Sequence, residues 1–476
     1  MNFVFANMLN ENSHTKLNTQ LTKQFLVSQD QLVPLKQMLY QMRNKDDLIC
    51  IGEKRLYTWQ DLKSHTAFLV QQLESHPAEQ QIALVFKSGF LMLCGLFAAL
   101  HCKRKIVLPS LQTVAHLKDI REHFSLLCTD DETFLTALNN PVCLFQCGNT
   151  APIDNLTMPK INDNEAEILL FTSGSTGKPK IIEKYVHLFD RQIAVEYKLL
   201  KERIQGSVMY STVNHNHLLG LMYRLLQPFA FRMPFFEYSL VIPEQLQKID
   251  TDYTLISSPA FLRFLDPNLA YPQARVIFSS GGKLPTKSGQ NAQNLLQCEV
   301  MEFYGSSETS AIAYRSFPQQ NWFLLEGIEF KQHEKDECLM ISSPFLLSSE
   351  WYKLEDKVRL NSDSFELLGR IDRVAKIGDK RVSLTQIEYL CLELSEIEEV
   401  KALVISDEIR ESVGIVAVLS EQYRHLTNKE ALALLRQHLR YRIELIALPR
   451  KIRCVEFMPM NEQGKLNLQQ LGRLFE

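Results

Sequence analysis

The chain has 476 residues, of which 45% are hydrophobic and 22% are charged, and its formal net charge is −3. This length is too great for a single hydrophobic core and predicts two or more domains. The near-neutral charge gives no electrostatic basis for binding nucleic acid, and the longest apolar run, residues 90–100, is too short to span a membrane.

The N-terminal segment and the cysteines bear on the cellular compartment. Residues 1–22 are rich in Asn, Gln and Thr and lack the apolar core of a signal peptide. The ten cysteines are scattered, and Cys143 and Cys147 form one isolated pair without a companion His or Cys cluster, which is poor evidence for zinc. We therefore expect reduced thiols and a cytoplasmic protein.

The N-terminal part of the chain alternates short apolar strands with helical segments. A strand at residues 82–86, a helix at 90–100 and a strand at 106–109 predict a parallel sheet covered by helices. Further strands each lead into a loop of small or polar residues, and ligands of open α/β sheets bind at the carboxyl ends of strands. These strands are expected at residues 168–171, 208–211, 254–257 and 276–279.

Beyond about residue 320 the pattern changes to short alternating segments, such as 338–341 and 365–368, which predict antiparallel strands. The last part of the chain is long enough for a small α+β domain with its own core. We predict an α/β fold with a large domain at residues 1–370, built of mainly parallel sheets plus this antiparallel portion, and a small domain at 371–476. In the small domain we expect helices at 386–394 and 429–445 and strands at 401–405 and 413–419.

Residues 172–180, with the sequence TSGSTGKPK, follow an apolar strand and form the most informative loop. Its backbone N–H groups and hydroxyls can face phosphate oxygens while its lysines supply positive charge. It is not a Walker A loop, because Thr172 stands where that pattern needs Gly and Pro179 follows Lys178. Taken alone, the loop also fits a flexible surface turn.

Further segments of the chain carry residues whose chemistry is compatible with binding a nucleotide. The two glycines of Ser280-Gly281-Gly282 allow close approach of the backbone to a flat base. In Tyr304-Gly305-Ser306-Ser307-Glu308, the carboxylate suits Mg²⁺, which is usually held by a carboxylate together with substrate phosphates. The remaining segments are His217-Leu218-Leu219-Gly220, residues 351–356 ending in Asp356, Gly369-Arg370-Ile371-Asp372, and Pro459 to Lys465 with Gly464 before the lysine.

Together these motifs resemble those of the adenylate-forming superfamily, which includes acyl-CoA synthetases, luciferases and peptide-synthetase adenylation domains. The resemblance covers most of the chain, and the spelling of residues 305–315 is similar to the compact synthetases of aryl-polyene and dialkylresorcinol clusters. Ser307 replaces the family's Thr and keeps the hydroxyl, whereas Leu354-Glu355 replaces Thr-Gly before Asp356. The glycine of the 376–382 loop is shifted by one position, which leaves the thiol acceptor open.

The resemblance implies a role for each of these residues. ATP and Mg²⁺ are the implied cofactors, with Glu308 as the magnesium ligand, Lys465 bridging the carboxylate and the α-phosphate, and His217 at the wall of the acyl pocket. Asp372 is the implied hinge of a mobile small domain. The implied nucleotide-binding residues are Thr172, Ser173, Gly174, Ser175, Thr176, Gly177, Lys180, Ser280, Gly281, Gly282, Tyr304, Gly305, Ser307, Asp356 and Arg370.

The implied reaction is ATP-dependent activation of a carboxylic acid as its acyl adenylate, with release of pyrophosphate, followed by transfer to a thiol. The acid can be aryl or fatty, and the thiol can belong to CoA or to an acyl carrier protein. Relatives that select amino acids usually carry an Asp near His217, and none lies between Ser207 and Phe229. A non-catalytic nucleotide-binding homologue and a luciferase-like oxidase are the alternatives.

Overall fold

A computed structural model gives the fold. It describes residues 32–37, 43–77, 81–134, 138, 142–144, 167–172, 180–370, 373–377, 380–406, 411–440, 442–460 and 466–476. The chain divides into two compact units, and the second takes in the antiparallel strands that precede residue 370. The division at residue 370 therefore stays a prediction. Unit 1 comprises Met1–Pro318, Leu325–Gly327 and Ser343–Ser349, and unit 2 comprises Gln319–Leu324, Ile328–Ser342 and Glu350–Glu476.

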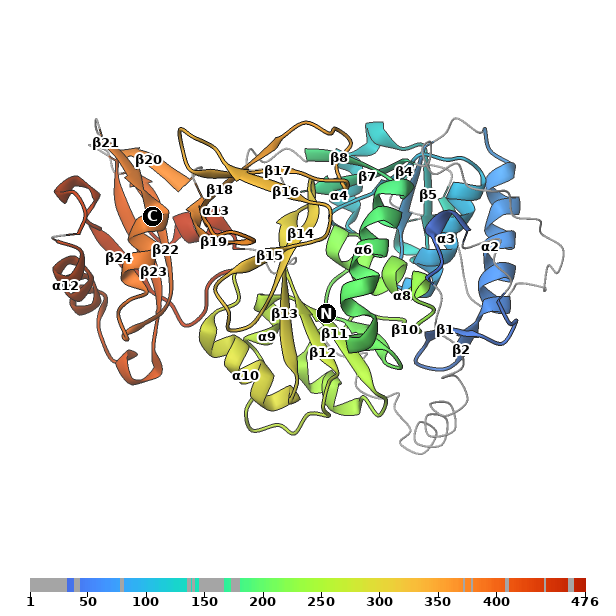
Figure 1. Ribbon diagram of the computed structural model, residues 1–476, viewed down its shortest axis with the longest axis horizontal. Coiled ribbons are helices and arrows are strands. Elements are labelled where there is room, and N and C mark those ends of the chain that lie inside the picture. The colour runs from blue at the N-terminus through green and yellow to red at the C-terminus, as the bar shows by residue number, and fades with distance from the viewer. Residues whose placement is uncertain are drawn as a thin grey trace. The chain divides into compact units, whose positions relative to one another are not determined.

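Unit 1 contains a six-stranded sheet that is parallel except for its last pair (Figure 1). The predicted strand–helix–strand segment at its centre is confirmed, because β3 and β4 pair in parallel and flank helix α3. In order across the sheet, the strands are β6 (Val142–Leu144), β5 (Leu126–Thr129), β3 (Ile82–Val85), β4 (Ile106–Leu108), β7 (Glu167–Thr172) and β8 (Lys180–Tyr185).

A second set of strands in unit 1 runs in parallel from β13 to β1, with one antiparallel strand added at each end. Three of the strands predicted from the sequence, at residues 208–211, 254–257 and 276–279, therefore lie in this parallel set. In order, they are β14 (Ser310–Ser316), β13 (Glu299–Ser306), β12 (Val276–Ser279), β11 (Tyr253–Ser257), β9 (Val208–Ser211), β10 (Phe235–Phe236), β1 (Leu48–Ile51) and β2 (Leu56–Thr58).

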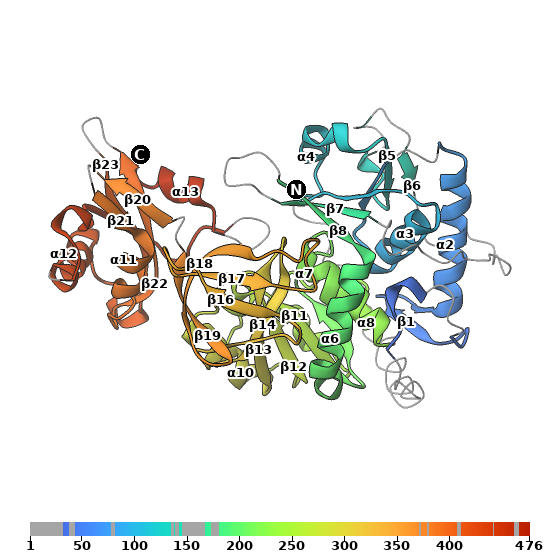
Figure 2. The ribbon, with the colours of Figure 1, turned by 45° about the horizontal axis from the view of Figure 1, so that its top comes forward.

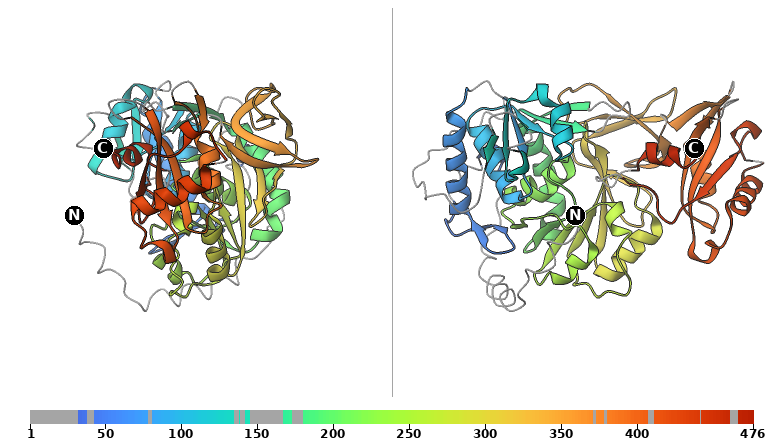
Figure 3. Two further views of the ribbon diagram at one scale, coloured as in Figure 1. Left: turned by 90° about the vertical axis from the view of Figure 1, so that its left-hand side faces the viewer. Right: turned by 180° about the vertical axis from the view of Figure 1, so that it is seen from behind.

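Helix α3 lies in the core of unit 1 and is buried along almost its whole length. Ser88 caps its first turn by accepting a hydrogen bond from Leu91 N, and residues 89–100 are all buried. The long helix α2 runs beside it, as the blue ribbon shows from behind in Figure 3. The helices of unit 1 are α2 (Trp59–Glu74), α3 (Gly89–His101), α4 (Val114–Asp119), α6 (Val186–Ile204), α7 (Leu218–Gly220), α8 (Gln227–Ala230), α9 (Pro259–Leu262) and α10 (Thr286–Leu296), with short turns η1 (Leu35–Gln37), η2 (Arg121–His123), η3 (Leu221–Leu226) and η4 (Pro243–Lys248).

Unit 2 begins with an antiparallel sheet, which confirms the strands predicted at 338–341 and 365–368. Its C-terminal part is α+β, as predicted, with helices beside a three-stranded sheet (Figure 2), and it has a separate apolar core of its own. The first sheet has the order β16 (Glu329–Gln332), β17 (Cys338–Ser342), β18 (Tyr352–Leu360), β19 (Ser364–Arg370) and β15 (Trp322–Leu324). The C-terminal elements are β20 (Val374–Ile377), β21 (Lys380–Ser383), α11 (Leu384–Cys391), β22 (Ile397–Ser406), β23 (Glu411–Leu419), η6 (Glu421–Tyr423), α12 (Asn428–Leu439), η7 (Leu445–Ala447), β24 (Lys451–Cys454) and α13 (Leu468–Arg473).

One helix prediction in unit 2 is wrong in length. The helix expected at residues 429–445 ends at Leu439, and a separate short turn covers Leu445–Ala447. The apolar residues that extended the prediction do not continue the buried face, because Leu445 is 72% exposed and Ile446 is 41% exposed. Among the described residues no helix is both long enough and apolar enough to cross a membrane, and the eight cysteines whose side chains are described are not in disulfides.

Glu196 is a carboxyl group buried within the helices of unit 1. It accepts hydrogen bonds from Gln192 Nε2 at 2.8 Å, Tyr223 Oη at 2.6 Å and Gln227 Nε2 at 2.7 Å. Burial raises its pKa from 4.5 to about 7, although these three donors favour the charged form. The folded state therefore binds more protons than the unfolded state between these two pH values.

The unfolding free energy should consequently fall as the pH rises from 4.5 to about 7, by roughly 3 kcal/mol from this group. We expect Glu196→Gln to remove this component, so the variant gains stability relative to the parent as the pH rises. Urea unfolding of both proteins at about pH 5 and about pH 8 measures the difference. Glu202→Gln, at an exposed position of α6, is the matched control, and an equal pH response in all three proteins would contradict the prediction.

Candidate nucleotide site

Three groups of predicted site residues in unit 1 follow neighbouring parallel strands. Strands β9, β11, β12 and β13 are adjacent, so their carboxyl ends meet at one edge of the sheet. His217 follows β9, Ser280 to Gly282 follow β12, and Tyr304 to Glu308 close β13. Two contacts join these ends: Ser280 Oγ donates to Phe303 O at 2.8 Å, and the hydroxyls of Thr212 and Ser257 lie 3.1 Å apart.

Glu308 lies in the tight turn between β13 and β14. Side-chain hydroxyls shape this turn, because Thr309 Oγ1 accepts from Ser306 N at 3.0 Å and Thr309 N donates to Ser306 Oγ at 3.2 Å. Ser310, at the end of the turn, has a left-handed backbone with φ of 63°. At Gly305 a side chain has no room, since a Cβ would lie 1.9 Å from Ser310 O. The conformation that presents Glu308 therefore depends on several residues of the motif.

The phosphate loop meets Glu308 through Lys180. Strands β7 and β8 pair so that Thr172 faces Lys180 across the base of the loop, and Ser173, Gly174, Ser175, Thr176 and Gly177 lie outside the described residues. Lys180 Nζ lies 2.5 Å from Glu308 Oε1. Burial is the largest single influence and raises the pKa of Glu308, but the hydrogen bonds from Lys180, from the backbone and from Ser306, together with the charge of Lys180, outweigh it and leave the pKa below its usual range. Two predicted site residues far apart in the sequence are thus in direct contact.

Lys184 is a residue of this site that the sequence analysis missed. It lies on β8 with 2% of its surface exposed, and its Nζ donates to Glu308 O at 2.7 Å and to Ser310 Oγ at 3.0 Å. Burial lowers its pKa to about 8, while the charge of Glu308 opposes this shift. The available signal was its place in the strand: side chains alternate, and Lys184 shares its face with buried Ile182.

The loop that carries His217 is held from within. Asn214 O accepts from His217 N at 3.2 Å, and a Cβ on Gly220 would lie only 2.1 Å from the same oxygen. Buried His215 donates from Nε2 to Phe86 O at 2.8 Å and accepts at Nδ1 from Arg224 Nη1 at 3.1 Å. Burial, and next the charge of Arg224, keep the pKa of His215 well below its usual value, so this imidazole is neutral.

The three-residue spacing between His217 and Gly220 is therefore explained by the fold of this loop, in addition to the role that the resemblance implies for His217. Asn216 adds two further contacts, donating from Nδ2 to Leu84 O at 3.3 Å and to Pro109 O at 3.2 Å. The loop after β9 is thus fixed to the ends of β3 and β4, and His217 extends from a rigid support.

The two residues expected to bind ribose lie together in unit 2. Asp356 on β18 faces Arg370 on β19, with Arg370 Nη1 3.7 Å from Asp356 Oδ2. This register places both side chains on one face of the antiparallel pair. Asp372 and Lys465 lie outside the described residues.

Comparison with known proteins decides the family. The model of the family described as AMP-binding enzyme matches residues 40–329, which is more than half of the chain. The chain belongs to the AMP-binding enzyme family. The resemblance read from the motifs is confirmed, and so are the α/β fold class and the prediction of an enzyme.

The relatives of this AMP-binding enzyme include VraA of Staphylococcus aureus strain COL, named as a candidate long chain fatty acid-CoA ligase. It is 24% identical over 333 residues, which cover 64% of this chain and 70% of VraA. ATP-bound MatB from Rhodopseudomonas palustris is similar in structure, with a TM-score of 0.77, 14% identity, and 92% and 98% of the two chains covered. A benzoate CoA ligase from Burkholderia xenovorans LB400 has a TM-score of 0.73 and 16% identity, covering 93% of this chain and all of its own.

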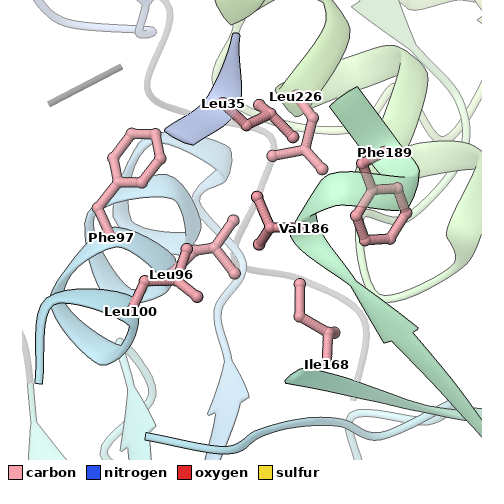
Figure 4. Close-up of a pocket in the computed structure, with 8 residues that line it drawn as sticks. All are labelled: Leu35, Leu96, Phe97, Leu100, Ile168, Val186, Phe189 and Leu226. Atoms are coloured by element: carbon pink, nitrogen blue, oxygen red, sulfur yellow. The ribbon is translucent and has the colours of Figure 1, made fainter. Parts of the chain in front are cut away.

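The AMP-binding enzyme also contains a small apolar cavity in unit 1 (Figure 4). None of the predicted site residues lines it, and its walls come from hydrophobic side chains of α3, α6, β7 and two short helical turns. It is therefore a gap within the core and does not identify the acid that this enzyme activates. Its lining residues are Leu35, Leu96, Phe97, Leu100, Ile168, Val186, Phe189 and Leu226.

The described residues fit a magnesium ion held mainly by its nucleotide. They contain no group of three or more His, Cys, Asp or Glu side chains suited to holding a metal by themselves. The Glu308 carboxylate is 27% exposed, and the Lys180 ammonium beside it shows that cationic groups are favoured there. One carboxylate next to a phosphate loop matches the usual way in which Mg²⁺ is bound, through one or two carboxylates and substrate phosphates.

Proposed function

We propose that this AMP-binding enzyme is an acid–thiol ligase, which activates a carboxylic acid with ATP and then transfers the acyl group to a thiol. The contact between Lys180 and Glu308 carries the proposal, because it joins the phosphate loop to the motif expected to bind the metal. The family match and the similarity to CoA ligases support the same chemistry.

In the first half-reaction a carboxylate oxygen of the acid attacks the α-phosphorus of ATP, and the bond from this phosphorus to pyrophosphate breaks. Both reactants are anions, so the barrier lies largely in positioning and charge neutralisation. Residues 172–177 and Lys180 hold the terminal phosphates, and Lys465 neutralises the two reacting anions. Glu308, together with the phosphates, would hold a magnesium ion, which would supply further positive charge.

The adenine is assigned to Gly281, Gly282 and Tyr304, and the ribose to Asp356 and Arg370. Gly281 and Gly282 leave open space where side chains would stand, since a Cβ on Gly282 would meet only Pro259 Cγ, at 4.0 Å. A flat base fits against such a bare backbone segment. Tyr304 stacks on the adenine, Ser307 contacts the α-phosphate, and Asp356 with Arg370 binds the ribose hydroxyls.

In the second half-reaction a thiol attacks the activated carbonyl, AMP leaves with the electron pair of the broken bond, and a thioester forms. Lys465 and its domain occupy the acyl side during adenylation. The small domain therefore turns about Asp372 to present another surface to the adenylate. The thiol belongs either to CoA or to the phosphopantetheine arm of an acyl carrier protein.

The acid is proposed to be aryl or fatty. VraA is named for fatty acids and the Burkholderia ligase for benzoate, and the absence of Asp between Ser207 and Phe229 disfavours an α-amino acid. The loop with His217 forms one wall of the acid site, on the support that His215 and Arg224 provide.

Exchange of radiolabelled pyrophosphate into ATP tests the proposal, with panels of aryl, fatty and amino acids. We expect exchange with a single class of acid and formation of its thioester when CoA or a carrier protein is added. Protein that binds ATP but supports no exchange with any acid would instead indicate a non-catalytic homologue. Exchange with amino acids alone would contradict the proposed substrate class.

A further inference from the structure

Two lysines of strand β8 hold the Glu308 turn in different ways. Lys180 and Lys184 lie four residues apart and share one face of the strand. Lys180 is exposed and contacts the carboxylate, whereas Lys184 is buried and contacts the backbone oxygen of the same residue. The motif that resembles the adenylate-forming superfamily assigns no role to Lys184.

Burial of the Lys184 ammonium group destabilises the fold unless its hydrogen bonds compensate for the lost hydration. Moving an ammonium group out of water is strongly unfavourable, and it is tolerated where hydrogen bonds satisfy the charge. Both acceptors, Glu308 O at 2.7 Å and Ser310 Oγ at 3.0 Å, are uncharged and both belong to one turn. An apolar residue such as the neighbouring Ile182 would fill this position without that cost.

The internal bonds of the turn do not determine where it lies relative to strand β8. The bonds between Ser306 and Thr309 and the left-handed Ser310 fix its internal shape. Lys184 joins this shape to β8, the strand that leads directly out of the phosphate loop. Lys180 cannot replace it as a permanent link, because its ammonium occupies the carboxylate that the metal requires.

We propose that Lys184 is a positioning residue that fixes the Glu308 carboxylate relative to strand β8 and so sets the affinity for magnesium-bound ATP. This inference rests on the proposed function only in taking Glu308 as the magnesium ligand. The proposal predicts that loss of Lys184 weakens magnesium-dependent ATP binding only when Glu308 is present. A lysine needed only for folding would weaken binding equally with and without Glu308. Partners that orient metal ligands in this way commonly change metal affinity about 10- to 100-fold when removed.

The test compares Lys184→Met with the parent, because methionine has a similar length and neither charge nor hydrogen-bond donor. Calorimetric binding of ATP over a magnesium series gives the metal concentration for half-maximal binding without any turnover. We expect that concentration to rise at least roughly tenfold in Lys184→Met. Lys198→Met is the matched control: Lys198 is exposed on α6, pairs with Glu326 at 2.8 Å, and should leave the concentration unchanged.

A double-mutant cycle with Glu308→Gln separates positioning from general damage. In the Glu308→Gln background, Lys184→Met should cause little further change, because the ligand that it positions is already lost. Equal effects in both backgrounds would overturn the proposal, and so would an unchanged magnesium requirement in a folded Lys184→Met protein. If Lys184→Met does not fold, Ser310→Ala removes one of the two acceptors and should raise the requirement by a smaller factor; no rise would overturn the proposal.

The same measurements distinguish this inference from the proposed function. Parent protein that binds magnesium and ATP, shows the Lys184 effect and supports no exchange would contradict the ligase function and leave the positioning role intact. Parent protein with exchange but no Lys184 effect would overturn the positioning role alone. Absence of ATP binding in the parent would overturn both.

Discussion

Replacing Lys465 with alanine should reduce acyl-adenylate formation by roughly a thousandfold or more, while thiolysis of a supplied acyl adenylate changes little. In adenylation two anions approach each other, and the ammonium of Lys465 is expected to stabilise both as charge moves between them. After the small domain turns, Lys465 no longer takes part, so the second half-reaction proceeds without it. Pyrophosphate exchange measures the first step, and release of AMP from a synthetic acyl adenylate plus thiol measures the second.

The matched control for this prediction is Lys451→Ala, which removes an exposed lysine from β24 of the same unit. This variant should support exchange at the rate of the parent. Comparable losses of both half-reactions in Lys465→Ala would contradict the assigned role, because they would indicate a defect in folding or in ATP binding. Unfolding temperatures of the three proteins distinguish these two causes.

The sequence predicted the fold well where apolar runs are short and uninterrupted. The strands at residues 208–211 and 276–279 agree with β9 and β12, because buried parallel strands are apolar on both faces and end sharply at polar loops. Prediction was weaker at α12, where Ile443, Leu445 and Ile446 continue the apolar pattern and Leu445 is nevertheless exposed. Periodicity shows which residues can be buried, whereas packing decides which residues are.

The candidate site likewise contains residues that the sequence predicted and residues that it did not. Motif order placed Lys180 and Glu308 in one site, and their contact, which joins β8 of one sheet to the β13–β14 turn of another, agrees with it. Lys184 was missed because a lysine in a strand next to a loop normally faces solvent, and its buried partners are a backbone oxygen and a serine hydroxyl 124 and 126 residues away. Alternation with Ile182 indicates that Lys184 can be buried, but no local sequence signal identifies partners so far away in the chain. The acid pocket was also beyond prediction, because its depth depends on side chains from several elements.

Replacing Gly305 with alanine should remove nucleotide binding more completely than changes at the other glycines of the site. A Cβ there would lie 1.9 Å from Ser310 O and 2.9 Å from Ala311 Cα, which are backbone atoms that no side-chain rotation can move aside. The β13–β14 pair must therefore open where its register already shifts, between Tyr304 and Gly305. We expect the unfolding free energy to fall by about 1–3 kcal/mol and ATP affinity to fall at least roughly a hundredfold.

Gly282→Ala provides the informative contrast, because its Cβ would meet only one side-chain atom, at 4.0 Å. This variant should unfold at the temperature of the parent, so any loss of ATP affinity must come from contact between the new methyl group and the ligand. Gly472→Ala, where nothing lies within 4 Å, controls for the substitution itself. Calorimetric ATP binding and thermal unfolding of the three variants then separate the two uses of glycine. If Gly305→Ala bound ATP as the parent does, the turn would not be rigid, and Glu308 would not depend on its shape for position.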